Sequence, residues 1–179
     1  IIRMFNSAFD ALATKVVPDL YPTDLREEID AVNEIVYNSI NNGVYKAGFA
    51  TSQEAYETVY TALFEALDQM EARLATQRYL TGARITEADW RLYATLVRFD
   101  AVYVGHFKCN RQRITDFPNL SNYLRELYQW PGIAGTVDIP RTKQHYYGSH
   151  TAINPFGIVP TGPELDFDSP HDRGRLPVY

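Results

Sequence analysis

The sequence predicts an all-α protein, a helical bundle followed by an extended C-terminal tail rich in Pro and Gly. Apolar residues recur at three- and four-residue steps in four separate segments between positions 23 and 130, which is the period of an amphipathic helix. No convincing run alternates apolar and polar residues, as the strands of a half-buried sheet do. Beyond Tyr147 the composition changes to GSHTAINPFGIVPTGPELDFDSPHDRGRLPVY, which lacks helical periodicity.

The composition is typical of one globular domain. The 179 residues are 45% hydrophobic, which is ample for a core. The 17 Lys and Arg and 22 Asp and Glu give a net charge of −5 and are spread along the chain, so we expect no nucleic-acid partner. No apolar run approaches the roughly 18 to 20 residues that span a bilayer, so we expect no membrane partner. The single cysteine, Cys109, excludes an intrachain disulfide and fits a reducing compartment, which predicts a soluble cytoplasmic protein.

The first forty residues carry two helical patterns. The opening IIRMFNSAFDAL resembles the interior of a helix and lacks an initiator Met, a basic region and a cleavage site, so we expect a fragment of a longer protein. The second pattern runs from Thr23 to Ile40 and is predicted to end at Asn41–Gly43. That end places Tyr45 just after a helix. The apolar stripe of this second helix comprises Leu25, Ile29, Val32, Val36 and Ile40.

A longer helix is predicted from Ser52 to about Thr76. Acidic residues occupy its outer faces, and its inward stripe comprises Ala55, Val59, Leu63, Leu67, Met70 and Leu74. The next helix starts at Thr86, which has capping-box spacing to Asp89, with Ile85 and Trp90 as the hydrophobic staple. This helix is apolar on most of its circumference, so we expect it to be central and buried, with Tyr103 on its inner stripe.

A fourth helix is predicted to open at Pro118 and to close at Pro131 and Gly132. We expect residues 1–147 to form the helical domain and residues 148–179 to form a tail packed on that domain. The tail keeps apolar residues that would lie against the helical body, namely Ile153, Phe156, Ile158, Val159, Leu165 and Phe167.

Three tyrosines are the candidate functional residues: Tyr45 in NNGVYKAGFA, Tyr103 in RFDAVYVGHFKCN and Tyr146 in QHYYGSH. A phenol can steady a thiolate by hydrogen bonding or exchange a proton with an aromatic alcohol. Taken singly, each is better explained as a packed aromatic anchor. Gly43 and Gly48 on either side of Tyr45 permit unusual backbone angles and close approach of another group.

Other polar clusters have weaker signals. Cys109 lacks a motif with His and carboxylate partners that would activate it, so we expect an inert structural thiol. The histidines His106, His145 and His150 have no third and fourth ligand at a recognisable spacing, which predicts no metal. Three cations between two helices could hold an anion or stay solvated: Lys108, Arg111 and Arg113.

Three segments in order closely resemble the C-terminal helical domain of xi-class glutathione transferases, which are glutathionyl-hydroquinone reductases. They are LYPTDLREEIDAVNEIVYNSINNGVYKAGFATSQEAYE, RYLTGARITEADWRLYATLVRFDAVYVGHFKCN and HYYGSHTAINPFGIVPTGP. The likeness runs from about Ile1 to about His171. One minor departure is VDIPRTK before QHYYGSH, where relatives often carry a histidine.

The resemblance implies an enzyme whose catalytic Cys-Pro-Trp motif and main glutathione contacts lie in an N-terminal thioredoxin-like domain absent from this chain. It implies reductive removal of glutathione from glutathionyl-hydroquinones, with glutathione as cosubstrate and no metal. Tyr45 matches the family residue that exchanges a proton with the leaving quinol. Tyr103 and Tyr146 match residues that hydrogen-bond near the thiolate and lower its pKa. A homodimer built through the helical domain is also implied.

Two alternatives compete with this interpretation. The chain could be a non-catalytic helical module for binding or dimerisation that has lost the thiol domain. It could also belong to a conventional transferase that conjugates glutathione to electrophiles. A Cys-Pro-Trp motif in the upstream coding sequence would count against both.

Overall fold

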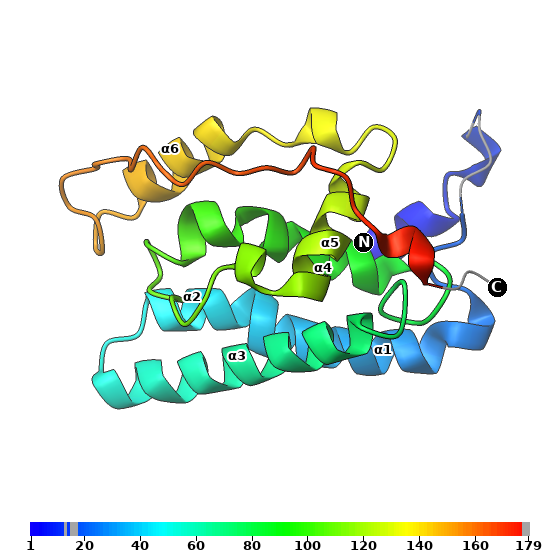
Figure 1. The fold of residues 1–179 in the computed structure, drawn as a ribbon, viewed down its shortest axis with the longest axis horizontal. Helices are drawn as coiled ribbons and strands as arrows, with labels where there is room; N and C mark the ends of the chain where they lie inside the picture. The colour runs from blue at the N-terminus through cyan, green and yellow to red at the C-terminus, as the bar shows by residue number, and fades with distance from the viewer. Residues whose placement is uncertain (13, 15–17, 177–179) are drawn as a thin grey trace.

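The computed structural model describes residues 1–12, 14 and 18–176, and the regular structure within them is helical (Figure 1). One isolated bridge joins Tyr79 and Gly82, and no strand occurs in these residues. None of the described helices is long and apolar enough to cross a membrane. The predicted all-α class is therefore confirmed. The α-helices are α1 (Arg26–Ile35), α2 (Asn42–Gly48), α3 (Gln53–Leu74), α4 (Glu87–Arg98), α5 (Pro118–Tyr128) and α6 (Ile139–Ser149).

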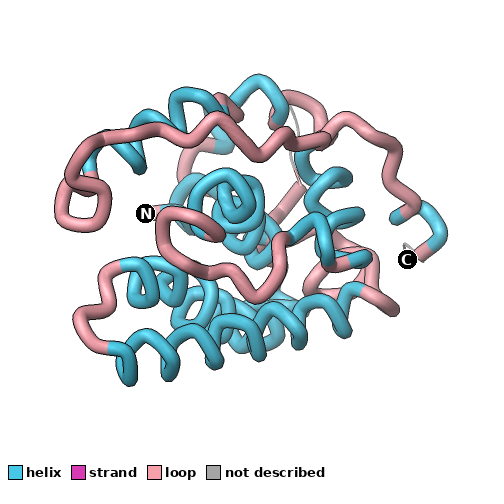
Figure 2. The backbone as a smooth tube through the Cα atoms, turned by 60° about the vertical axis from the view of Figure 1, so that its left-hand side comes forward, coloured by secondary structure: helices cyan, strands magenta, loops and turns pink. Residues whose placement is uncertain are grey.

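The helices lie in three layers, which both ribbon and tube views show (Figures 1 and 2). α4 and α5 form the middle layer, with α1, α2 and α3 on one side and α6 on the other. After α6 the chain turns and runs back along that helix as an extended tail (Figure 2). This arrangement brings α2, the end of α4 and α6 to the same end of the molecule, where the three tyrosines lie.

The predicted helix end at Asn41–Gly43 is wrong. A π-helical turn, Val36–Asn41, carries the helical backbone without a break into α2, so Tyr45 lies on a helix and not after one. The apolar stripe continues through this turn, because Ile40 and Val44 are fully buried. Burial of that stripe outweighs the helix-breaking preference of Asn and Gly. The wider π-turn shifts which residues face the core.

The capping box before α4 is confirmed. Thr86 is the N-cap, and the Asp89 carboxylate accepts from the Thr86 backbone N–H at 2.8 Å. Asp89 is fully buried and also accepts from the Leu80 N–H at 2.9 Å and the Tyr123 hydroxyl at 2.7 Å. Burial raises the pKa of this carboxyl group, and the donated hydrogen bonds oppose that rise. One side chain therefore joins the loop before α4 to α5.

The central helix is buried as expected, and its helical path extends beyond α4 in a second π-helical turn, Phe99–Tyr103. Leu92, Phe99 and Val102 are fully buried. α3 starts where a helix was predicted, and Ser52 is its N-cap, with the side chain accepting from the Ala55 N–H. Its stripe is buried from Leu63 onward, whereas Ala55 is exposed, because the first turns of α3 project past α2 (Figure 1).

Helix α5 starts at Pro118 as predicted, but α6 was not expected from the sequence. Asp138 caps α6 by accepting from the Arg141 N–H at 2.9 Å, and Pro140 lies in its first turn. This cap followed by a proline is a helix start signal that could have revealed the helix. Tyr146 consequently lies on a helix near its C-terminal end. The opening residues form two 3-10 turns, Ile2–Asn6 and Asp10–Leu12, and not the expected helix interior.

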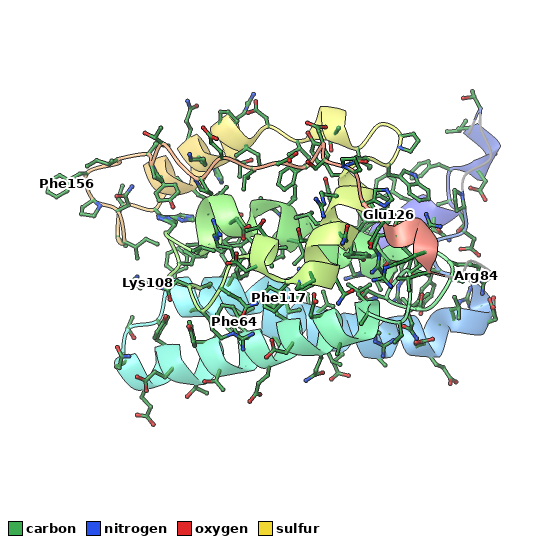
Figure 3. The ribbon with its side chains drawn as sticks, in the orientation of Figure 1. Phe64, Arg84, Lys108, Phe117, Glu126 and Phe156 are labelled. Atoms are coloured by element: carbon green, nitrogen blue, oxygen red, sulfur yellow. The ribbon has the colours of Figure 1, made fainter. Side chains whose placement is uncertain are left out.

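The tail lies against the body through part of its apolar residues. Ile153, Leu165 and Phe167 pack on the core, as expected. The expectation is wrong for the loop carrying Phe156, which is 88% exposed and projects away from the helices (Figure 3), and also for Ile158 and Val159, which are exposed. Polar anchors hold the rest of the tail.

The main polar anchor is Arg173, a fully buried residue that the sequence did not single out. Its guanidinium donates to the backbone carbonyls of Leu74, Gln77 and Arg78, each at 2.6 Å. These carbonyls lie at and just beyond the C-terminal end of α3, where they have no partner within the helix. Arg173 therefore ties the end of the tail to α3.

Candidate functional site

The three candidate tyrosines meet at one point. The Tyr45 hydroxyl of α2 lies 2.6 Å from the Tyr146 hydroxyl of α6, and the Tyr103 hydroxyl lies 3.0 Å from the same Tyr146 oxygen. The pairs are separated by 101 and 43 positions in the chain. Tyr146 therefore links the other two phenols in a continuous chain of hydroxyl groups.

A phenylalanine that the sequence analysis did not select supports all three rings. The centroid of Phe107 lies 5.3 Å from that of Tyr45, 5.5 Å from Tyr103 and 6.0 Å from Tyr146. These separations are typical of favourable aromatic pairs. In the sequence, the one signal for this supporting role is that Phe107 follows Tyr103 by four residues. The same spacing is equally typical of any buried apolar residue.

Gly48 allows Phe107 to approach α2 closely. A Cβ atom added at Gly48 would overlap the ring of Phe107, which is fully buried. The expected unusual backbone angle is absent, because neither Gly43 nor Gly48 has a positive φ. The close approach that the sequence suggested is present at Gly48, whereas a Cβ at Gly43 would meet Leu63 Cδ1 at an ordinary 3.6 Å.

We expect Gly48→Ala to lower the free energy of unfolding by about 1–3 kcal/mol, because the buried ring must move to admit the methyl group. Gly43→Ala is the matched control, since it lies in the same helix with space for a methyl group. It should be neutral or stabilise by up to about 1 kcal/mol through helix propensity. Urea unfolding of both variants measures the difference, and equal stabilities would contradict the close packing.

The phenols adjoin an open groove of about 520 Å³ between α2 and α4. Tyr45 is 39% exposed there, whereas Tyr103 and Tyr146 are 1% and 5% exposed. Tyr45 is thus the most accessible of the three candidate phenols, and Tyr37, which is 54% exposed, also lines the groove. Trp90 and Ala94 supply apolar surface of the groove, and Asn41, Thr95 and Arg98 supply its polar groups.

The two inner phenols stay protonated at neutral pH. Burial raises the pKa of Tyr103 and of Tyr146, because a phenolate is poorly solvated there. The positive charge of Arg98 opposes the rise in both. Arg98 forms no ion pair with any described carboxylate, so its charge remains available to an anion in the groove. Both buried tyrosines can therefore act as hydrogen-bond donors.

Cys109 is not placed to act as a nucleophile. It is fully buried, and burial raises the pKa of its thiol to about 12. Its Sγ atom lies 3.7 Å from the Phe107 carbonyl oxygen. This environment agrees with the expected inert thiol.

The remaining polar candidates form separate pairs. Arg111 pairs with Asp68 and Arg113 pairs with Asp116, so these cations do not assemble into one anion site. His106 and His150 form a pair in which His106 Nε2 lies 3.0 Å from His150 Nδ1. No group of three or more His, Cys, Asp or Glu residues in the described part of the chain is arranged to hold a metal ion.

Comparisons with known proteins identify the family. Residues 53–126 match the family model described as glutathione S-transferase, C-terminal domain. The chain is 56% identical over 173 residues to glutathionyl-hydroquinone reductase YqjG of Escherichia coli, covering 97% of this chain and 52% of the relative. The chain spans about half the length of the curated relatives it matches.

Solved structures agree with the sequence matches. The glutathione-bound structure of YqjG superposes with a TM-score of 0.93 at 55% identity, covering 97% of this chain and 56% of that one. The xi-class glutathione transferase of Natrialba magadii superposes with a TM-score of 0.95 at 51% identity, covering 98% and 53%. The chain therefore belongs to the xi class of glutathione transferases and corresponds to their C-terminal helical domain.

Proposed function

We propose that this chain is the substrate-side domain of a glutathionyl-hydroquinone reductase, which removes glutathione reductively from glutathionyl-hydroquinones. One observation carries the proposal: three tyrosines from distant segments converge on one chain of hydroxyls beside a groove, in a protein 56% identical to such a reductase. The groove supplies aromatic walls and phenolic donors. The reactive thiol and the main contacts to the cosubstrate glutathione would come from an N-terminal thioredoxin-like domain.

The proposed reaction begins when the thiolate of that domain attacks the sulfur of the conjugate. The carbon–sulfur bond breaks, and the aromatic ring leaves with its electron pair and takes up a proton. The enzyme is left as a mixed disulfide with glutathione. A second glutathione thiolate attacks that disulfide, releases oxidised glutathione and restores the thiol.

Tyr45 is the proposed proton donor, and the hydroxyl chain supports this role. In the proposed order of donation, Tyr103, the most buried of the three candidate phenols, donates to Tyr146, which donates in turn to Tyr45. The Tyr45 oxygen then accepts one hydrogen bond and keeps its own proton for the groove. This order also stabilises the negative charge that Tyr45 carries after transfer.

Tyr103 and Tyr146 are the proposed stabilisers of the thiolate before the conjugate reacts; each phenol has one proton to donate, so in this role a hydroxyl turns from its tyrosine partner toward the sulfur. Hydrogen bonds donated to an anion favour the anion, so these phenols would lower the pKa of the catalytic thiol. Their burial supports the role, because a donor that stays neutral keeps its proton throughout the reaction. The family likeness further favours a homodimer through this domain, which light scattering of the full-length protein measures.

Side-by-side assays of this chain and its full-length parent test the proposal. We expect the parent to reduce glutathionyl-menadiol with glutathione and this chain to be inactive, because Cys109 is buried with a raised pKa. Activity in neither protein would favour a helical binding module. Activity in this chain alone would return Cys109 to the mechanism and contradict the divided site.

A further inference from the structure

The histidine pair, His106 and His150, lies directly beside the phenol chain. His106 follows Tyr103 by three residues, and His150 follows Tyr146 by four, at the C-cap of α6. The two elements that carry the buried phenols are thus joined twice, by the 3.0 Å contact of Tyr103 and Tyr146 hydroxyls and by the 3.0 Å contact of His106 Nε2 and His150 Nδ1.

Both imidazoles share the ring that supports the phenols. His106 and His150 stack on Phe107 at centroid distances of 5.1 and 5.7 Å, with interplanar angles of 25° and 18°. The edge of His150 also meets Tyr146, at 5.6 Å and 89°. The histidine pair and the phenol chain are therefore two sets of polar contacts that share the ring of Phe107, which we call the aromatic platform.

Helix α6 depends on few contacts for its position. Within the described chain it packs chiefly against the π-helical turn Phe99–Tyr103, and most of its residues are at least partly exposed. Lys143 and Tyr146 are its only buried side chains. Lys143 donates to the tail carbonyls of Thr161 and Gly162, so it holds the tail and not the platform. The histidine pair is a polar side-chain contact at the end of α6 nearest Tyr146, where the ring of Tyr147 also packs on His106 at 4.4 Å.

We propose that His106 and His150 are positioning residues that hold the Tyr146 hydroxyl between those of Tyr45 and Tyr103, and that a second proton on the pair releases it. The contact requires one nitrogen to donate and the other to accept, so only one of the two imidazoles can be charged. This inference rests on the proposed function, because it attributes the fall of the reductase activity at low pH, the acid limb of the pH profile, to the histidine pair.

The surroundings oppose protonation of both imidazoles. Burial lowers the pKa of each, His150 and Lys108 lower that of His106, and His145 lowers that of His150. The backbone of Tyr146 raises the pKa of His106 through a hydrogen bond, and the remaining neighbours are the neutral rings of Phe49, Phe107 and Tyr147. No carboxylate contributes to either shift.

The sign of the pH dependence follows from these shifts. A histidine whose pKa is depressed by folding is neutral in the folded protein above its ordinary value of about 6.5. The pair is therefore intact at neutral pH. As the pH falls below about 6.5 and through the depressed pKa values of the two histidines, the pair no longer stabilises the position of Tyr146. The reason is that the unfolded or opened state binds more protons than the folded state.

Substitutions at His150 in the full-length protein separate hydrogen bonding from packing. His150→Phe keeps the ring and removes the nitrogen, and we expect kcat to fall roughly tenfold because Tyr146 is no longer aligned. His150→Asn keeps a polar atom near the place of Nδ1 without a titrating group, so it should restore most of kcat. Gln144→Ala, at an exposed position on the same helix, is the matched control and should leave kcat unchanged.

The pH profile and a double substitution decide the outcome. The acid limb expected of the wild-type protein should disappear in His150→Asn, and His150→Phe should cause no further loss in a Tyr146→Phe background. Losses that multiply in the double variant, or an acid limb unchanged in His150→Asn, would overturn the inference. Melting temperatures of all variants identify any that fail to fold.

An observation independent of catalysis keeps the two proposals apart. Imidazole ¹⁵N titration of this chain should show His106 and His150 titrating below about 6.5 in a coupled manner. Independent titration of both at an unshifted value would overturn the pair even if the reductase assay succeeds. A wild-type parent without reductase activity, together with coupled titration, would contradict the proposed function and leave the structural pair in place.

Discussion

Tyr45→Phe in the full-length protein is expected to lower kcat for hydroquinone release by roughly 100-fold, the scale of one proton transfer by a positioned side chain. The ring would still pack on Phe107 at 5.3 Å, so the fold and the groove wall should persist. Only the hydroxyl that lies 2.6 Å from that of Tyr146, on a residue that lines the groove, is lost. We therefore expect KM to change much less than kcat.

Steady-state kinetics with glutathionyl-menadiol, combined with rapid-quench measurement of quinol release, separates this step from regeneration of the thiol. Tyr60→Phe is the matched control, because Tyr60 is a half-buried tyrosine on α3 away from the groove. It should leave kcat unchanged. If Tyr45→Phe turned over as fast as the wild-type protein, Tyr45 would be a wall of the groove and not a proton donor.

The second large effect is expected for stability. Asp89→Ala should lower the free energy of unfolding by about 3–5 kcal/mol, because it leaves three buried donors without a partner. They are the backbone N–H groups of Leu80 and Thr86 and the hydroxyl of Tyr123. For a chain of this size the melting temperature should fall by roughly 10 °C.

Differential scanning calorimetry of this chain measures the Asp89→Ala effect. Asp168→Ala is the control, since Asp168 is an exposed tail residue and should change stability by less than about 0.5 kcal/mol. A loss of less than about 1 kcal/mol for Asp89→Ala would mean that water replaces the carboxylate and that the capping box contributes little.

Local signals were reliable where a helix start depends on neighbouring residues. The Thr86 and Asp89 box and the Ser52 cap each satisfy N–H groups within a few residues, so their spacing can be read directly. The same signal is present at Asp138 and Pro140, where α6 starts although no helix was predicted there. The information that places this helix start is local as well.

Other features could not be derived from local patterns. Asn41, Asn42 and Gly43 favour the end of a helix, yet the buried stripe from Val36 to Val44 keeps the backbone helical through a π-turn. Arg173 has no local feature that distinguishes it from a surface arginine, yet it is fully buried against the end of α3. Both outcomes depend on contacts with residues far away in the chain.

The sequence by itself determined the all-α class, the capped starts of its main helices and the resemblance to the xi class, since periodicity, caps and motifs are properties of adjacent residues. It also selected Tyr45, Tyr103 and Tyr146. Only the tertiary structure decided that their hydroxyls form one chain over Phe107, and that two histidines lie beside it. The physical reason is that packing of α2, α4 and α6 joins residues up to 101 positions apart, a distance no local pattern encodes.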